Sequence, residues 1–125
     1  MKKRYEFART SRLLTPGDFR NVFDHVDAKI SCSEITLLAK KTDLDTNRIG
    51  FIIAKKQVKT AVARNRIKRH FRENFRIFNK NAQNLQKFDF IVLARKATQD
   101  LDNPKLDQTI QSLLKRLKKR IENTN

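Results

Sequence analysis

The segment KKQVKTAVARNRIKRHFRENFR, Lys55 to Arg76, carries half of the net charge of the chain. It holds nine Lys and Arg residues and one acid, Glu73, so nine minus one gives +8 of the formal +16. Apolar residues recur through the segment at helical spacing: Ile67, Phe71, Phe75 and Phe78. We therefore predict a helix from about Thr60 to Phe78, with a buried apolar stripe and a basic outer face.

The basic face of this predicted helix points to a polyanionic partner. At about 100° per residue, five polar residues share one arc: Asn65, Lys68, Arg69, Arg72 and Arg76. A solvated charged face usually alternates sign, because like charges four residues apart repel each other. The pattern favours a nucleic acid over an anionic membrane or an acidic protein. Arg64 and Arg66 fall outside the arc, near the first turn, where we expect their side chains to reach toward a ligand.

Length and composition describe one folded domain. A chain of 125 residues with nine Phe and 38% hydrophobic residues can build a core, unlike disordered chains, which are poor in aromatics. Cys32 is the single cysteine, so no intramolecular disulfide forms. No apolar run is long enough for a signal peptide or a membrane span. We predict a cytoplasmic protein with one domain over 1–125, including a basic N-terminal segment at 1–12 and a frayed end at 122–125.

Shorter patterns place the remaining elements. Thr15 and Pro16 are typical of a helix start, because Thr caps the first turn and Pro suits it, and this helix should run to about His25. A last helix should open at Asn103. Alternating apolar residues predict the strands: 34–40, 48–55 and 89–95, with a further short edge strand near 29–33. The predicted class is α/β (α+β), a two-layer sandwich in the order α-β-β-α-β-α.

The first two of these main strands are apolar on both faces. One face carries Ile35, Leu37, Ala39, Ile49, Phe51 and Ile53, and a milder face carries Thr36, Leu38, Gly50, Ile52 and Ala54. Such a sheet is either covered on both sides or presents a binding surface. Phe19 and Phe23 should face the milder side, either as core residues or as stacking platforms for unpaired bases. If the rings bind unpaired bases, we expect the effect to be clearer for Phe19, because it lies nearer the helix start, where the cleft should be open.

The sequence supplies little for catalysis. His25 and His70 have no metal-ligand spacing with Cys32 or with a carboxylate. Asp43 and Asp45 could hold Mg²⁺, but two acids in a short polar loop are more typical of a turn. Two glycines are too few for a Gly-rich phosphate loop. The residues alone predict a protein that binds a macromolecule and has no small-molecule substrate.

The segment ARNRIKRHFRENF, Ala63 to Phe75, resembles the RNR signature of the bacterial ribonuclease P protein subunit. The motif R-N-R-x-K-R-x-x-R-E is far more specific than a generic basic helix. The resemblance extends through LLTPGDFRNVF (13–23), RIGFIIAKKQV (48–58), DFIVLARK (89–96) and the final helix. It implies a non-catalytic subunit that binds a catalytic RNA, which removes the 5′ leader from precursor tRNA with Mg²⁺ bound mainly by the RNA. It also implies a left-handed β-α-β crossover, against the general right-handed preference.

The resemblance also implies two sets of contact residues in this chain. Contacts with the ribonuclease P RNA fall on Lys55, Lys56, Arg64, Asn65, Arg66, Lys68, Arg69, Arg72 and Arg76. The single-stranded leader is expected to bind in a cleft between the first helix and the sheet. The residues assigned to it are Phe19, Phe23, Leu38, Ile52 and Arg95. Two readings from other classes stay open at this point: a general RNA-binding or ribosomal protein, and a protein nuclease with its own metal site.

Overall fold

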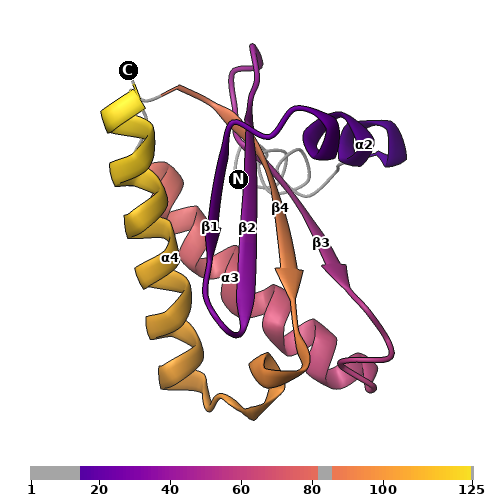
Figure 1. Cartoon of the computed structure of the whole chain (residues 1–125). Coiled ribbons are helices and arrows are strands. Elements are labelled where there is room, and N and C mark those ends of the chain that lie inside the picture. The colour runs from indigo at the N-terminus through magenta and orange to yellow at the C-terminus, as the bar shows by residue number, and fades with distance from the viewer. Residues whose placement is uncertain (1–14, 82–85, 125) are drawn as a thin grey trace, which may run out of the picture.

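The computed structural model describes residues 15–81 and 86–124, so the predicted basic segment at 1–12 lies outside the described residues (Figure 1). The elements follow in the order α2 (Pro16–Asp24), β1 (Ala28–Ser31), β2 (Ile35–Lys41), β3 (Arg48–Ile53), α3 (Ala61–Asn81), β4 (Phe88–Ala94), the 3₁₀ helix η1 (Lys96–Asp100) and α4 (Asn103–Thr124). The α+β class is confirmed, and β1 is the predicted short edge strand. The prediction missed η1 and ended the basic helix too early, because α3 continues past Phe78 to Asn81.

The four strands form one sheet in the order β1-β2-β4-β3. β2 pairs antiparallel with both β1 and β4, whereas β3 and β4 run parallel and are connected through α3. Because β3 and β4 are parallel, both strands start at one end of the sheet and finish at the other. We call these the amino end, where Arg48 pairs with Asp89, and the carboxyl end, where Ile53 pairs with Ala94.

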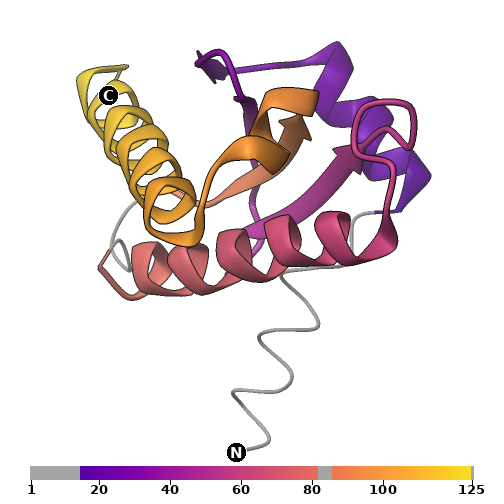
Figure 2. The ribbon, with the colours of Figure 1, turned by 90° about the horizontal axis from the view of Figure 1, so that it is seen from below.

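The larger apolar core lies between the sheet and the two long helices. Three members of the predicted stripe of α3 are buried: Phe71 and Phe75 lie in this core, and Ile67 lies in a smaller cluster with Val58 and Ala94. The fourth, Phe78, is only partly buried against the larger core. The first predicted strand face packs into the same core through Ile35, Leu37, Ala39 and Ile49. Figure 2 shows α3 below the sheet and α2 on its opposite side. Asn65, Arg69 and Arg76 are the exposed members of the basic arc, on the outer side of α3.

The milder face of the sheet carries α2. Thr15 caps this helix as predicted, because Asp18 N donates to Thr15 Oγ1 at 3.2 Å and Thr15 N donates to Asp18 Oδ2 at 2.9 Å. Val22 is fully buried in a small cluster with Leu38 and Ile91. Only part of this face is covered, since Ile52 on the edge strand β3 is 38% exposed.

A partly buried polar layer joins α3 to α4. His70 Nδ1 lies 2.9 Å from Asp107 Oδ1, and Asn74 Nδ2 donates to the same oxygen at 2.9 Å. The hydrogen bond with His70 is the main cause that lowers the pKa of Asp107.

Within the described ranges, none of the helices has the length and apolar character that a bilayer crossing requires.

Candidate nucleic-acid interface

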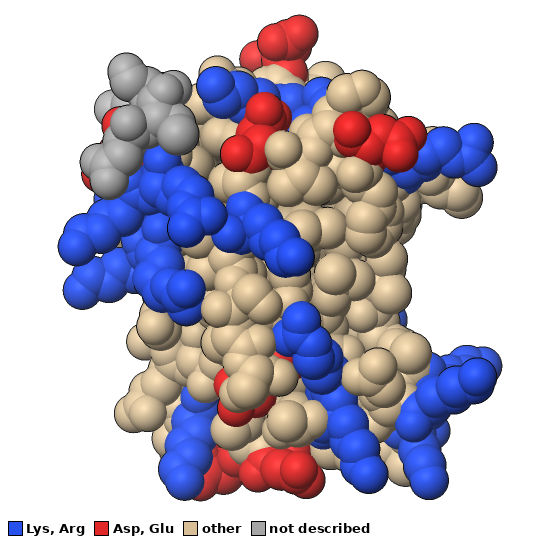
Figure 3. Space-filling model, viewed as in Figure 1, with Lys and Arg blue, Asp and Glu red and all other residues tan. Residues whose placement is uncertain are grey.

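Three predicted contact residues, two for the RNA subunit and one for the leader, gather at the carboxyl end of the sheet. Strand β3 ends at Ile53, two residues earlier than predicted, so Lys55 and Lys56 are exposed in the turn that follows it. Arg95 follows β4 directly. Because the two parallel strands finish together, these three cations share one end of the molecule, where α3 also begins. Figure 3 shows Lys and Arg side chains at the lower right, over the region where β3 ends and α3 starts.

The basic arc of α3 continues this surface along the helix. Asn65 and Arg69 are exposed, and Lys68 is half-buried. The guanidinium of Arg72 lies 5.5 Å from the centre of the Phe51 ring, which fixes its position through a cation–π contact. The cations of this arc therefore continue from the carboxyl end of the sheet along α3 to its middle.

The carboxyl-terminal part of the arc is partly neutralised. Glu73, the one acid of the basic segment, accepts a hydrogen bond from Arg76 Nη2 at 2.6 Å. This bond is the main cause that raises the pKa of Arg76 above its usual value. Arg76 therefore forms an ion pair within α3, although the sequence placed it on the same arc as Lys68 and Arg69.

Arg64 and Arg66 do not simply reach outward, which corrects the expectation for the first turn. Arg64 Nη1 donates to the carbonyl oxygen of Val58 at 2.8 Å. Arg66 Nε donates to Asn103 Oδ1 at 2.7 Å, and its Nη2 donates to the carbonyl oxygen of Leu101. Both guanidiniums thus hold loop carbonyls near the start of α3. A guanidinium has five N–H donors, so each retains donors for a phosphate.

The residues assigned to the leader lie on one face but at different depths. Leu38 is 6% exposed beneath α2, and Phe19 packs half-buried against the cluster that contains it. Phe23 is 46% exposed, and Ile52 is 38% exposed on the uncovered strand β3. The expectation that the cleft is open at Phe19 is therefore wrong. Phe19 packs against the sheet, whereas Phe23, one turn later, presents much of its ring to solvent.

Arg95 is held across the carboxyl end of this face. Its Nη1 donates to the carbonyl oxygen of Cys32 at 2.9 Å, and its Nη2 donates to Thr36 Oγ1. Thr36 Oγ1 also lies 2.8 Å from Ser31 Oγ, so the hydroxyl pair and the guanidinium form one network. This network places a fixed cation beside the exposed apolar surface.

An ion-pair network at the amino end fixes α2, and the sequence prediction missed it. Arg48 makes two hydrogen bonds to Asp89, from Nε to Oδ1 at 2.9 Å and from Nη2 to Oδ2 at 2.8 Å. Its Nη1 reaches Asp18 Oδ2 on α2 at 3.3 Å. The bond to Asp89 is the main cause that raises the pKa of Arg48. A lone acid inside the apolar strand FDFIVLA was the available signal of a buried ion pair.

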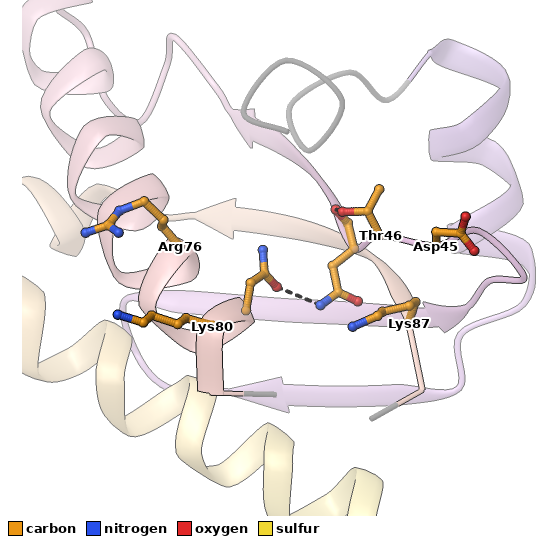
Figure 4. A pocket seen from close by; sticks show the side chains of 7 residues that line it. Asp45, Thr46, Arg76, Lys80 and Lys87 are labelled. Atoms are coloured by element: carbon orange, nitrogen blue, oxygen red, sulfur yellow. Dashed lines mark hydrogen bonds between the residues drawn. The ribbon is translucent and has the colours of Figure 1, made fainter. Parts of the chain in front are cut away.

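A second missed feature is a pocket of about 420 Å³ at the amino end of the sheet (Figure 4). It lies between the last turns of α3 and the segments that lead into β3 and β4. Its lining residues are all polar or charged: Asp45, Thr46, Asn47, Arg76, Asn79, Lys80 and Lys87. The basic residues at the carboxyl end of the sheet do not contribute to it.

Comparison with known proteins settles the family. The model of the family described as Ribonuclease P matches residues 7–118. The chain belongs to the ribonuclease P protein family. The ribonuclease P protein component of Ectopseudomonas mendocina (strain ymp) is 48% identical over 111 residues, which cover 89% of this chain and 81% of that protein. The component of Stutzerimonas stutzeri (strain A1501) is 45% identical over 111 residues, 89% of this chain and 82% of that protein.

Solved ribonuclease P proteins have the same fold. The Staphylococcus aureus RNase P protein superposes with a TM-score of 0.76 at 27% identity, covering 86% of this chain and 95% of that chain. The Thermotoga maritima RNase P protein gives a TM-score of 0.70 at 29% identity, with 84% and 96% covered. The ribonuclease P family makes this chain an RNA-binding, tRNA-processing subunit of an endoribonuclease.

Proposed function

We propose that this ribonuclease P protein binds the RNA subunit through the carboxyl end of the sheet and the basic arc of α3. One observation carries the proposal: exposed cations from the β3 turn and from α3 converge, while the single acid of that segment pairs with Arg76 farther along the helix. Neutralising phosphates with such cations releases counterions and gives salt-dependent affinity. Half-buried Lys68 and Arg72 are partly desolvated, which strengthens charge-assisted hydrogen bonds.

The RNA subunit, in this proposal, carries the cleavage chemistry and binds most of the Mg²⁺. Mg²⁺ prefers oxygen ligands and keeps several waters, which suits phosphate oxygens. Over 15–81 and 86–124, no three His, Cys, Asp or Glu side chains gather in a way that could hold a metal ion. The protein would act by neutralising phosphates near the reacting bond, which raises the local occupancy of Mg²⁺.

The exposed part of the milder sheet face is the proposed site of the precursor-tRNA leader. Phe23 offers an accessible ring and Ile52 an apolar floor, with Arg95 at the carboxyl end of the same face. Unpaired bases stack on aromatic rings with little sequence preference, which suits leaders of varied sequence. The surface lies beside the proposed RNA contacts, so one protein can hold the leader and the RNA subunit together.

The RNA that co-purifies with the chain from its own cells tests this function. We expect one structured species that, after protein removal, cleaves precursor tRNA in Mg²⁺. A general RNA-binding or ribosomal protein would instead co-purify with ribosomal RNA or with a mixture of RNA species. Such a mixture without precursor-cleaving activity would contradict the proposal.

Replacing Phe23 with Ala should weaken precursor-tRNA binding by the reconstituted enzyme by about 1–3 kcal/mol, because a stacking platform is lost. Mature tRNA, which has no leader, should bind as well as before, and the melting temperature should change little because the ring is already 46% exposed. Phe19→Ala is the matched comparison. It should lower stability by about 3 kcal/mol, the low end for a Phe truncation. A lower melting temperature for Phe23→Ala with an unchanged precursor-to-mature affinity ratio would assign that ring to the core.

A further inference from the structure

Two asparagines in the pocket at the amino end have side-chain orientations fixed by a backbone group. Phe88 N–H donates to Asn47 Oδ1 at 2.7 Å, and Asn47 Nδ2 donates to Asn79 Oδ1 at 2.6 Å. A backbone N–H can only donate, so Asn47 must turn its oxygen toward Phe88 and its amide nitrogen toward Asn79. Asn79 must then turn its own oxygen to Asn47 and its Nδ2 the other way.

This orientation leaves a buried donor without an acceptor. Asn79 is 8% exposed, and its Nδ2 has no hydrogen-bond partner among the described residues. A buried donor left unpaired costs about 1–3 kcal/mol, so native proteins usually supply an acceptor. Asn79 lines the pocket, and a ligand oxygen entering there could accept this bond after a small shift of the flexible side chains around it.

The other groups around the pocket select a negatively charged ligand. Arg76 and Lys80 come from α3, with Arg76 also paired to Glu73, and Lys87 comes from the segment just before β4 on the other side (Figure 4). Asp45 is the only acid among the lining residues. The negative end of the α3 dipole accounts for a cation such as Lys80 in the last turn. The helix dipole does not account for Lys87, which lies outside α3. It also does not account for the unpartnered donor of Asn79.

We propose that this pocket binds a phosphate group of an RNA backbone. The proposal rests on the function proposed above and adds a second point of contact to it. Asn79 lies ten residues after Arg69, which is about 15 Å along α3 at 1.5 Å per residue. The pocket shares Arg76 with the far end of the basic arc, but it lies at the opposite end of the sheet from Lys55 and Lys56. The phosphate comes either from the RNA subunit or from precursor tRNA.

Asn79→Asp tests the site with little change of shape. One carboxylate oxygen still accepts the bond from Asn47, while the other replaces the donor with a negative acceptor, which repels a phosphate. Asn81→Asp is the matched control, because it introduces the same charge at an exposed position two residues later that does not line the pocket. The measurements are Kd for ribonuclease P RNA and Kd of the reconstituted enzyme for precursor tRNA, each over a range of salt concentrations.

Asn79→Asp should weaken binding about tenfold and reduce the salt dependence by about one phosphate, while Asn81→Asp stays within about twofold. A loss in the first measurement assigns the phosphate to the RNA subunit, and a loss only in the second assigns it to precursor tRNA. Equal effects of both variants in both measurements would overturn the proposal. If Asn79→Asp lowers the melting temperature, Lys80→Gln, at an exposed position, replaces it, and unchanged affinities in that variant would overturn the proposal. Failure of the wild type to bind ribonuclease P RNA would instead refute the proposed function.

Discussion

Replacing Arg48 with Ala is expected to destabilise the fold by about 3–5 kcal/mol, because it leaves a buried carboxylate without its partner. Asp89 is 3% exposed and receives two hydrogen bonds from Arg48. After the substitution, this carboxylate lies in a poorly solvated site without its counter-charge. Urea unfolding monitored by circular dichroism measures the loss. A free energy of unfolding within 1 kcal/mol of the wild type would show that the ion pair contributes little.

Three variants separate the parts of this network. Arg48→Lys keeps the charge but cannot form the bidentate pair, so its stability should lie between those of Arg48→Ala and the wild type. Asp18→Asn keeps an oxygen for the capping box of α2 and loses the charge that faces Arg48. It should cost less than Arg48→Ala. Asp24→Asn removes the same charge from exposed α2 surface and should be neutral.

The same network gives stability a defined dependence on pH. The backbone N–H of Thr15 is the largest cause that lowers the pKa of Asp18, and Arg48 adds to the effect. A lowered pKa in the folded state means that the contribution is complete above the ordinary aspartate pKa of about 4. It is lost as the pH falls through the folded-state pKa. Asp18→Asn should therefore reduce stability at neutral pH and make it less sensitive to acid.

A triple replacement of Lys55, Lys68 and Arg69 with Ala should reduce affinity for ribonuclease P RNA by at least about a hundredfold. Three lost phosphate contacts also lower the slope of log K against log salt by about two to three. All three side chains lie at the carboxyl end of the sheet or on the basic arc, and none belongs to the core. Filter binding or fluorescence anisotropy over a series of salt concentrations gives both quantities.

The matched control removes the same charge from α4. Lys105, Lys115 and Lys119 are exposed on that helix, and Figure 3 shows a second gathering of Lys and Arg at the left, over α4. Their replacement with Ala should reduce affinity by no more than about threefold, because long-range attraction alone is lost. Equal losses in the two triple variants would mean diffuse binding to a basic protein, without a dedicated surface.

The sequence predicted the elements whose residues interact with near neighbours in the chain. The spacing of Ile67, Phe71 and Phe75 predicted the buried stripe of α3, and Thr15 with Pro16 predicted the start of α2. The pairing of Arg48 with Asp89 was not predictable in this way. It depends on the parallel register of two strands separated by the whole of α3.

In the candidate site, too, features set by neighbouring residues were predictable, and features set by distant residues were not. The basic arc of α3 follows from helical spacing, so Asn65, Lys68 and Arg69 were correctly expected on one surface. The bonds of Arg66 to the Leu101 carbonyl and to Asn103 depend on where the loop before α4 returns to α3. The relative depths of the two Phe rings on α2 depend on how that helix lies against the sheet. Neither arrangement leaves a local pattern in the sequence.

Cleavage of precursor tRNA by a reconstituted mixture tests the proposed division of work between protein and RNA most directly. Precursor tRNA is incubated with the protein, with ribonuclease P RNA, and with both, at a Mg²⁺ concentration too low for the RNA to act well alone. Only the mixture should release the leader at the mature 5′ end, and the Lys55, Lys68 and Arg69 triple variant should restore little of this activity. Site-specific cleavage by protein freed of RNA, or a mixture no more active than the RNA alone, would contradict the proposal.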